Sequence, residues 1–284
     1  MISRRGFLQA SGVATVVGGQ AFAKQLTTLG VQLYTVRSVL PSKPAETLKA
    51  IEAIGYKEIE ATQAGVAGMW SALEATKLKP VSVHFDSKVV TLAPEDELAR
   101  AAEDMKKRGF QYGVMPYLPP AERGGLDVIK KLAERLNKAG EKCRAAGMKF
   151  AYHNHAFEFE PMGGTMPFDV LMANTDPKLV GLEMDVFWVS VAGHDPVELL
   201  SKVKGRVPLM HLKDKLKGTP TRYNESVPKE TFKEVGNGVI DWPKVLKAAD
   251  AAGVQHYFVE QDQTPGDPIE SLKQSYQFIS KLKY

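Results

Sequence analysis

The sequence is poor in several residue patterns that mark particular classes of protein. It contains a single cysteine, Cys143, so no disulfide can form within one chain. It has no run of basic residues of the kind found in nucleic-acid-binding proteins, and the formal net charge is only +4. No glycine/serine-rich linker or break in composition divides the chain. We therefore expect one domain after any leader, with Cys143 as a small core residue and no nucleic-acid partner.

Apolar runs long enough to span a bilayer are also missing. The run at residues 10–19 is short, follows a twin-arginine pattern at Arg4 and Arg5, and precedes an A-x-A cleavage pattern at residues 21–23. We therefore expect residues 1–23 to be a twin-arginine signal peptide and residues 24–284 to be the mature domain. This organisation predicts a periplasmic protein without a stable membrane anchor.

The remaining chain alternates between strand-like and helix-like segments. The predicted strands are residues 29–34, 56–60, 80–85, 112–115, 148–153, 180–186, 207–212 and 256–260. The predicted helices are residues 45–54, 70–77, 95–108, 125–146, 168–174, 196–203, 242–252 and 268–282. Eight strand–helix units in roughly 255 residues are typical of a (β/α)8 TIM barrel. A doubly wound open sheet is the alternative, but no glycine-rich phosphate loop follows the first strand.

Polar residues occupy one face of several predicted strands toward their carboxyl ends. In the fifth strand, for example, Tyr152 lies on the apolar face and His153 and His155 share the opposite face. Burying a charged side chain costs free energy, so several of them together suggest a functional site. Active sites of barrels lie at this end of the strands. The interior polar set is predicted to be Gln32, Tyr34, Glu60, His84, His153, His155, Glu183, Asp185, His211 and Glu260.

Carboxylate and imidazole groups on neighbouring strands suggest a metal site. This combination suits Mn, Co, Zn or Mg, whereas the lack of thiolates argues against a structural zinc site. We therefore expect one divalent ion per chain, bound by residues from adjacent strands at the carboxyl end of the barrel.

Several motifs in order along the chain resemble those of a known superfamily. They are the segments at residues 153–155, 184–188, 210–214, 234–238 and 258–260. Together they are similar to the xylose-isomerase-like TIM-barrel superfamily, which includes sugar phosphate isomerases/epimerases and inosose dehydratases. The resemblance implies a metal held by Asp185, His211, Glu260 and one residue of the fifth strand. Epimerase members have a glutamate within that strand, so we expect Glu158, just beyond it, to be the ligand, with His153 as the alternative.

The resemblance also implies roles for residues around the metal. A divalent ion that chelates a carbonyl and a neighbouring hydroxyl stabilises an enediolate as the alpha proton leaves. Glu260 or His155 is the expected base, and Lys213 is placed to neutralise an oxyanion. Glu158 is expected to take part in catalysis as well as in metal binding. The expected substrate contacts are Tyr34, His84, His153, Trp188 and Glu234.

The resemblance favours a metal-dependent isomerase, epimerase or lyase acting on a small carbohydrate or keto-sugar. Because histidines occupy the fifth strand where epimerases carry a glutamate, we expect elimination or dehydration more than symmetrical epimerisation. Two other classes are considered: a nuclease of the endonuclease IV type and a non-catalytic sugar-binding barrel. The oligomeric state is left open, a homo-oligomer included.

Overall fold

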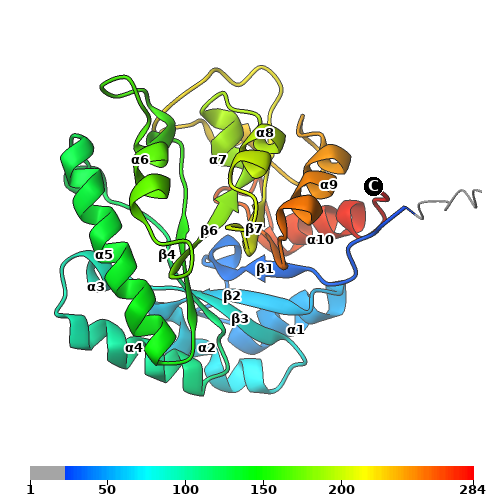
Figure 1. Ribbon diagram of the computed structural model, residues 1–284. Helices are drawn as coiled ribbons and strands as arrows, with labels where there is room; N and C mark the ends of the chain where they lie inside the picture. The colour runs from blue at the N-terminus through cyan, green and yellow to red at the C-terminus, as the bar shows by residue number, and fades with distance from the viewer. Residues whose placement is uncertain (1–22) are drawn as a thin grey trace, which may run out of the picture.

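Eight parallel strands close into one barrel in the computed structural model, which describes residues 23–284 (Figure 1). Their hydrogen-bonded order around the barrel is β1-β10-β7-β6-β5-β4-β3-β2. The strands are β1 (Gly30–Gln32), β2 (Glu58–Thr62), β3 (Lys79–His84), β4 (Tyr112–Met115), β5 (Lys149–His153), β6 (Val180–Asp185), β7 (Leu209–Leu212) and β10 (His256–Val259). The predicted (β/α)8 barrel is confirmed. The predicted signal peptide lies outside the described residues, except for Ala23 at its end.

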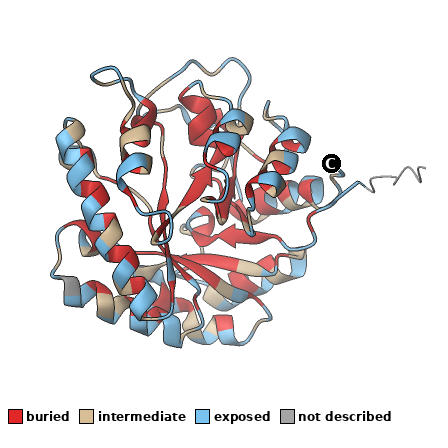
Figure 2. Cartoon of the chain, in the orientation of Figure 1, coloured by how far each residue is buried: buried red, intermediate tan, exposed pale blue. Residues whose placement is uncertain are grey.

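Helices cover the outside of the barrel. They are α1 (Pro44–Ile54), α2 (Gln63–Glu74), α3 (Ser87–Thr91), α4 (Glu95–Lys107), α5 (Leu126–Ala145), α6 (Pro167–Asn174), α7 (Val186–Val191), α8 (Pro196–Lys202), α9 (Trp242–Ala252) and α10 (Pro268–Ile279). In Figure 2 their inner sides are buried and their outer sides are exposed. Within residues 23–284, no helix combines the length and the apolar character needed to cross a membrane.

The barrel strands carry apolar residues on both faces, in two separate clusters. Outward-facing residues such as Phe150 and Leu182 belong to the large core between strands and helices. A smaller cluster fills the barrel interior below the carboxyl ends of the strands: Val81, Tyr112, Val114, Ala151, Leu209 and Phe258. This apolar floor closes the barrel from below, so the polar residues nearer the carboxyl ends are reached from that end only.

Strand register brings the key polar residues to one level. His153 pairs with Glu183 across β5 and β6, and Asp185 pairs with His211 across β6 and β7. On the other side of β7, His211 pairs with Phe258 of β10, two residues before Glu260. Alternation along each strand turns these side chains to the barrel interior, where they meet.

Two short helices directly after strands were not predicted. Strand β6 ends at Asp185, one residue earlier than expected, because its carboxylate accepts a hydrogen bond from the Trp188 N–H and caps α7. Helix α3 likewise begins after Asp86, which caps it. Helix α2 begins at Gln63 instead of residue 70, since burial of Val66 and Met69 offsets the weak helix propensity of its glycines.

Two further short strands and four 3-10 helices lie in the loops. Strands β8 (Asp214–Lys215) and β9 (Phe232–Lys233) form an antiparallel pair that anchors both ends of the long loop after β7. The 3-10 helices are η1 (Leu33–Val36), η2 (Pro120–Glu122), η3 (Phe157–Phe159) and η4 (Lys229–Thr231). All of these segments follow the carboxyl ends of barrel strands, which is the end that carries the polar residues.

Candidate active site

An upper group of three buried ligand-type residues lies at the carboxyl ends of β6, β7 and β10. Asp185, His211 and Glu260 each offer one donor atom, and these atoms lie within 4.8 Å of one another. The Nδ1 of His211 is 2.8 Å from Glu260 and 4.0 Å from Asp185. On the other side of Asp185, the Nε2 of His153 is 3.6 Å from its Oδ2. The structure therefore brings together three of the predicted metal ligands, with His153 beside them.

Lys213 places its ammonium group within this upper group. Its Nζ is 2.8 Å from Asp185, 2.5 Å from Glu260 and 3.1 Å from Asp262. Burial opposes its charge, yet these carboxylates, Asp185 foremost, raise the pKa of Lys213 well above its ordinary value. The Asp185 Oδ2 is buried, and the Lys213 ammonium beside it balances its negative charge.

A lower group of buried residues lies directly beneath. The Nε2 of His84 is 3.0 Å from Glu60 and 2.9 Å from Glu183. The other ring nitrogens of the two upper histidines also point here: His211 Nε2 is 2.6 Å from Glu60, and His153 Nδ1 is 3.0 Å from Glu183. His84, His153, Glu183 and His211 also lie close enough to hold an ion between them.

Opposite charges balance across the lower group. Burial disfavours an imidazolium, but Glu60 and Glu183 raise the pKa of His84 to about 10. Burial likewise disfavours ionisation of Glu60, but His84 and His211 hold the pKa of this carboxyl well below its ordinary value. Gln32 adds a hydrogen bond of 2.8 Å to Glu60, and Ser82 donates another. These partners make burial of the charges energetically tolerable.

His155 differs from the other site histidines because its Nδ1 is buried without a hydrogen-bond partner. The ring lies 5.4 Å from Trp188 and 5.1 Å from Tyr117, measured between ring centroids. Burial, with Lys213 nearby, lowers the pKa of His155 well below its ordinary value. The imidazole is therefore neutral at pH 7 and keeps a nitrogen available for proton transfer.

Glu158 lies apart from the upper group. Its carboxylate accepts a hydrogen bond of 2.7 Å from the Tyr152 hydroxyl and one of 2.9 Å from the backbone N–H of His155. Tyr152 points away from the barrel interior and belongs to the core between strands and helices. Glu158 therefore lies on the outer side of β5, and it belongs to neither group of metal-type residues among residues 23–284. The structure does not bring it together with Asp185, His211 and Glu260.

A cavity of about 510 Å³ opens above the upper group. The predicted residues that line it are Tyr34, His84, His153, His155, Trp188, Lys213 and Glu260. Phe232 of β9 and Val227 also line this cavity. Cavities of this size and mixed character hold small molecules. Trp188, one of the predicted substrate contacts, offers its indole ring to this space.

Glu234 is the predicted substrate contact that does not line this cavity. Its carboxylate accepts hydrogen bonds from Ser271 of α10 at 2.8 Å and from Asn237 at 3.3 Å. Gln261, directly after Glu260, donates a third at 3.4 Å. Glu234 thus ties the loop after β9 to α10 and supports the strand end that carries Glu260.

Sequence reasoning missed several cavity residues. Asp262 lies two residues after Glu260, so the strand alternation extended beyond β10 would have indicated it. Burial raises the pKa of Asp262 to about 6 even though Lys213 acts against this. Tyr117 and Glu225 lie in loops, where the sequence shows no helix-like or strand-like periodicity. No sequence signal therefore indicates that both line the cavity.

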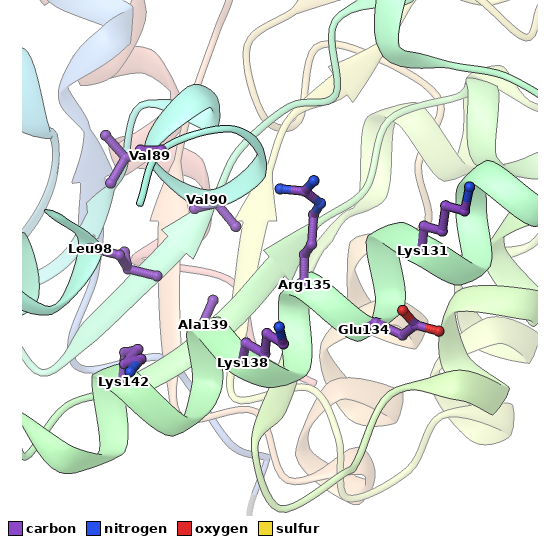
Figure 3. Close-up of a pocket in the computed structure, with 10 residues that line it drawn as sticks. Val89, Val90, Leu98, Lys131, Glu134, Arg135, Lys138, Ala139 and Lys142 are labelled. Atoms are coloured by element: carbon purple, nitrogen blue, oxygen red, sulfur yellow. The ribbon is translucent and has the colours of Figure 1, made fainter. Parts of the chain in front are cut away.

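A second cavity, of about 400 Å³, lies outside the barrel between α5 and the α3–α4 segment (Figure 3). It is lined by Val89, Val90, Ala93, Leu98, Lys131, Glu134, Arg135, Lys138, Ala139 and Lys142. These residues include one carboxylate and no histidine, and they lie away from the strand ends. The chemistry of the molecule is therefore concentrated at the barrel mouth.

A (β/α)8 barrel with buried carboxylates and imidazoles at the carboxyl ends of its strands has the architecture of TIM-barrel enzymes. The chain belongs to the Xylose isomerase-like TIM barrel family, whose profile matches residues 48–282. This confirms the family resemblance inferred from the motifs.

Individual relatives agree with this assignment. Inosose dehydratase of Geobacillus thermodenitrificans is 33% identical over 162 residues, which are 52% of this chain and 52% of that protein. The match thus spans about half the length of that relative. A sugar phosphate isomerase/epimerase of Parabacteroides distasonis superposes with a TM-score of 0.74 at 23% identity, covering 93% of this chain and 96% of that chain. The IOLI protein with a binding zinc atom superposes with a TM-score of 0.67 at 17% identity, covering 88% and 95%. These two structural likenesses concern the fold.

Proposed function

We propose that this protein is a divalent-metal-dependent lyase or isomerase acting on a neutral keto-sugar or ring polyol ketone. The observation that carries the proposal is the buried upper group of Asp185, His211 and Glu260, of which Glu260 lines the cavity. The curated relative named inosose dehydratase supports a ring polyol ketone as one substrate class.

The donor set of the upper group fits a divalent ion. Asp185, His211 and Glu260 would hold it, and His153 Nε2, beside Asp185, would serve as the fifth-strand ligand in place of Glu158. Oxygen and imidazole donors without thiolates suit Mn, Co, Zn or Mg. The buried donor atoms of Asp185, His211 and Glu260 support this fit, because they lie within 4.8 Å of one another. When bound, such an ion acts as a Lewis acid that stabilises negative charge on an enediolate.

His155 is the proposed base. Its neutral imidazole lines the cavity and takes the proton from the carbon alpha to the carbonyl through the ring nitrogen that carries no proton. The C–H electron pair then forms the enediolate double bond. The resulting imidazolium is acidic in this buried setting and protonates the oxygen substituent as the beta C–O bond breaks. One histidine thus serves both steps, which suits elimination better than symmetrical epimerisation.

Lys213 is the proposed electrostatic partner of the substrate oxygens. Its ammonium lines the cavity and is already held by Asp185, Glu260 and Asp262. A developing oxyanion beside it gains a charged hydrogen-bond donor.

The charge of the cavity favours a neutral substrate. Among the described residues that line it, Lys213 is the only lysine or arginine, whereas the carboxylates are Asp86, Glu225, Glu260 and Asp262. A phosphate group would have to lie among these four carboxylates with one ammonium that they already neutralise. The same balance disfavours the phosphate backbone of a nucleic acid.

The test uses the metal-loaded protein with a panel of an inosose and 3-keto-glucosides in deuterated water. We expect deuterium at the alpha carbon and an unsaturated ketone that absorbs in the near ultraviolet. His155→Ala should slow both steps by about 100-fold or more, the usual contribution of a general base. Clean interconversion of two epimers without an unsaturated product would assign the protein as an epimerase. Tight binding of a keto-sugar without alpha-proton exchange would instead indicate a binding protein.

A further inference from the structure

The two histidines at the metal-type site each use both ring nitrogens. His211 directs Nδ1 toward Glu260, at 2.8 Å, and Nε2 toward Glu60, at 2.6 Å. His153 directs Nε2 toward Asp185, at 3.6 Å, and Nδ1 toward Glu183, at 3.0 Å. Each imidazole therefore spans the space between the upper group and the lower group.

The side chains of Glu60 and Glu183 are held in place by burial and by several polar contacts. Both are fully buried, on β2 and β6, and both contact the same Nε2 of His84. Glu60 is also fixed by Gln32 and Ser82. Rigid carboxylates of this kind can determine which nitrogen of a neighbouring imidazole carries the proton.

We infer that Glu60 and Glu183 are positioning residues that select the tautomers of His211 and His153 for metal binding. A neutral histidine binds a metal through one nitrogen only when the other nitrogen carries the proton. With an ion bound, Glu60 would accept the Nε2–H of His211, and Nδ1 would be the nitrogen that binds the ion. Glu183 would likewise accept the Nδ1–H of His153, and Nε2 would be the nitrogen that binds the ion. A carboxylate acceptor also increases the basicity of the ligating nitrogen.

His84 completes this arrangement by balancing charge. The Nε2 of His84 contacts both Glu60 and Glu183. A positively charged His84 ring therefore offsets part of the repulsion between these two carboxylates. Two carboxylates beneath the ligands would otherwise be costly to bury. The inference rests on the proposed metal site, but it concerns residues that do not line the ligand position themselves.

A rival arrangement places the ion in the lower group, between His84, His153, Glu183 and His211. The two arrangements differ in the ring nitrogens that they use. In the upper group the ion meets Nδ1 of His211 and Nε2 of His153. In the lower group it meets the opposite nitrogen of each ring. This difference can be measured directly in the wild-type protein.

The first experiment is nitrogen NMR of the zinc-loaded wild-type protein with labelled histidine. We expect zinc-induced shifts at Nδ1 of His211 and Nε2 of His153, with protons on the opposite nitrogens, assigned with His211→Ala and His153→Ala. Zinc on Nε2 of His211 and Nδ1 of His153 would overturn the inference. A wild-type protein that binds no divalent ion would overturn both this inference and the proposed function. Zinc binding without turnover would count against the proposed function alone.

The second experiment measures zinc affinity by competition with a chelator. Glu60→Gln and Glu183→Gln should each bind zinc about 10- to 100-fold more weakly, with one ion per chain still bound at saturation. The matched control is Glu58→Gln. Glu58 lies on the same strand as Glu60 and makes a similar contact of 2.9 Å with His256, but away from both groups. Unchanged affinity in both test variants, with the folded state verified by circular dichroism, would contradict the inference.

Discussion

At the scale of single residues, the site shows how one barrel buries many charges. Lys213 is the clearest case, since its side chain is almost fully buried and its ammonium contacts three carboxylates. A buried ion of either sign costs several kcal/mol unless it has partners of opposite charge. The buried charges of Lys213 and its three carboxylate partners therefore depend on one another. Removing one of them leaves the charge of the others without a partner.

Glu158 gives a prediction about stability. Burial raises the pKa of its carboxyl to about 8, against the hydrogen bond from Tyr152, which lowers it. Between about pH 5 and pH 8 the folded chain therefore keeps a proton that the unfolded chain has lost. The free energy of unfolding must fall as pH rises through this window, by at most about 1.4 kcal/mol per pH unit from this group. Glu158→Gln mimics the neutral carboxyl, so its stability should depend less on pH.

Urea unfolding of the metal-free protein at several pH values tests this expectation. Glu160→Gln is the matched control, because Glu160 is exposed two residues away and should retain the wild-type pH dependence. Parallel stability curves for Glu158→Gln and wild type would contradict the prediction. The same variant tests the role of Glu158 at the site. We expect it to bind zinc with wild-type affinity, whereas loss of zinc would restore Glu158 as a ligand.

The alternation of side chains along strands made much of the site predictable. It placed Asp185, His211 and Glu260 on inward faces, and the structure brings them together. Alternation applies only while the backbone stays extended, which is why it could not place Glu158. There the chain turns into η3, and the Tyr152 hydroxyl holds the carboxylate on the outer side.

At the scale of elements, an ion pair joins two loops over the cavity. Arg123 follows η2, and its guanidinium donates to both oxygens of Glu225, at 2.9 and 3.1 Å, in the long loop between β8 and η4. The guanidinium also lies 3.7 Å from the centre of the Phe157 ring and 5.1 Å from that of Tyr117. Since Tyr117 and Glu225 both line the cavity, this pair fixes the wall opposite the barrel floor.

Breaking this pair should weaken substrate binding more than chemistry. We expect Glu225→Gln to raise KM about fivefold, equivalent to roughly 1 kcal/mol for a half-buried bidentate pair, with little change in kcat. Steady-state kinetics on the substrate found in the panel measures this split. Exchanging the charges, with Arg123→Glu and Glu225→Arg together, should recover part of the loss.

Glu230→Gln is the control for this pair, because Glu230 lies in the same stretch of chain but is exposed. It should leave both KM and kcat unchanged. A fall in kcat without a change in KM for Glu225→Gln would mean that the pair acts on the reacting groups instead of the cavity wall.

Element boundaries were less predictable than the number of strands. The number of strands was predictable because the sequence contains eight short apolar runs, each bounded by turn-forming residues. Side chains do not alternate regularly along β3, since Val81 lies in the interior floor whereas Val83 packs outward. The register between β2 and β3 shifts between Ile59 and Glu60, and such a bulge depends on pairing between strands.

At the scale of the whole molecule, the charge of the cavity differs from that of the chain. The chain carries a formal net charge of +4, but its cavity is lined by four carboxylates and one ammonium. The surplus of positive charge therefore lies elsewhere. Arg4 and Arg5 account for half of it, and without them the formal charge is +2. These two residues belong to the predicted leader.

The last prediction concerns export of the folded chain. The order of the twin arginines, the short apolar run and the A-x-A pattern at residues 21–23 motivates the proposal of a twin-arginine signal peptide. We propose that changing Arg4 and Arg5 to Lys traps the protein in the cytoplasm as an uncleaved precursor. Fractionation, immunoblotting and amino-terminal sequencing of the wild type should show a periplasmic form that begins at Lys24.

The control for export carries the same two substitutions in the barrel, Arg100→Lys and Arg108→Lys on and after α4, and should be exported normally. The barrel encloses its charged site only once all eight strands have closed, so a route that carries folded proteins would deliver the site already formed. Wild-type amounts of Arg4→Lys/Arg5→Lys protein in the periplasm would refute the twin-arginine assignment. The protein would then reach the periplasm by a route that does not depend on the arginine pair.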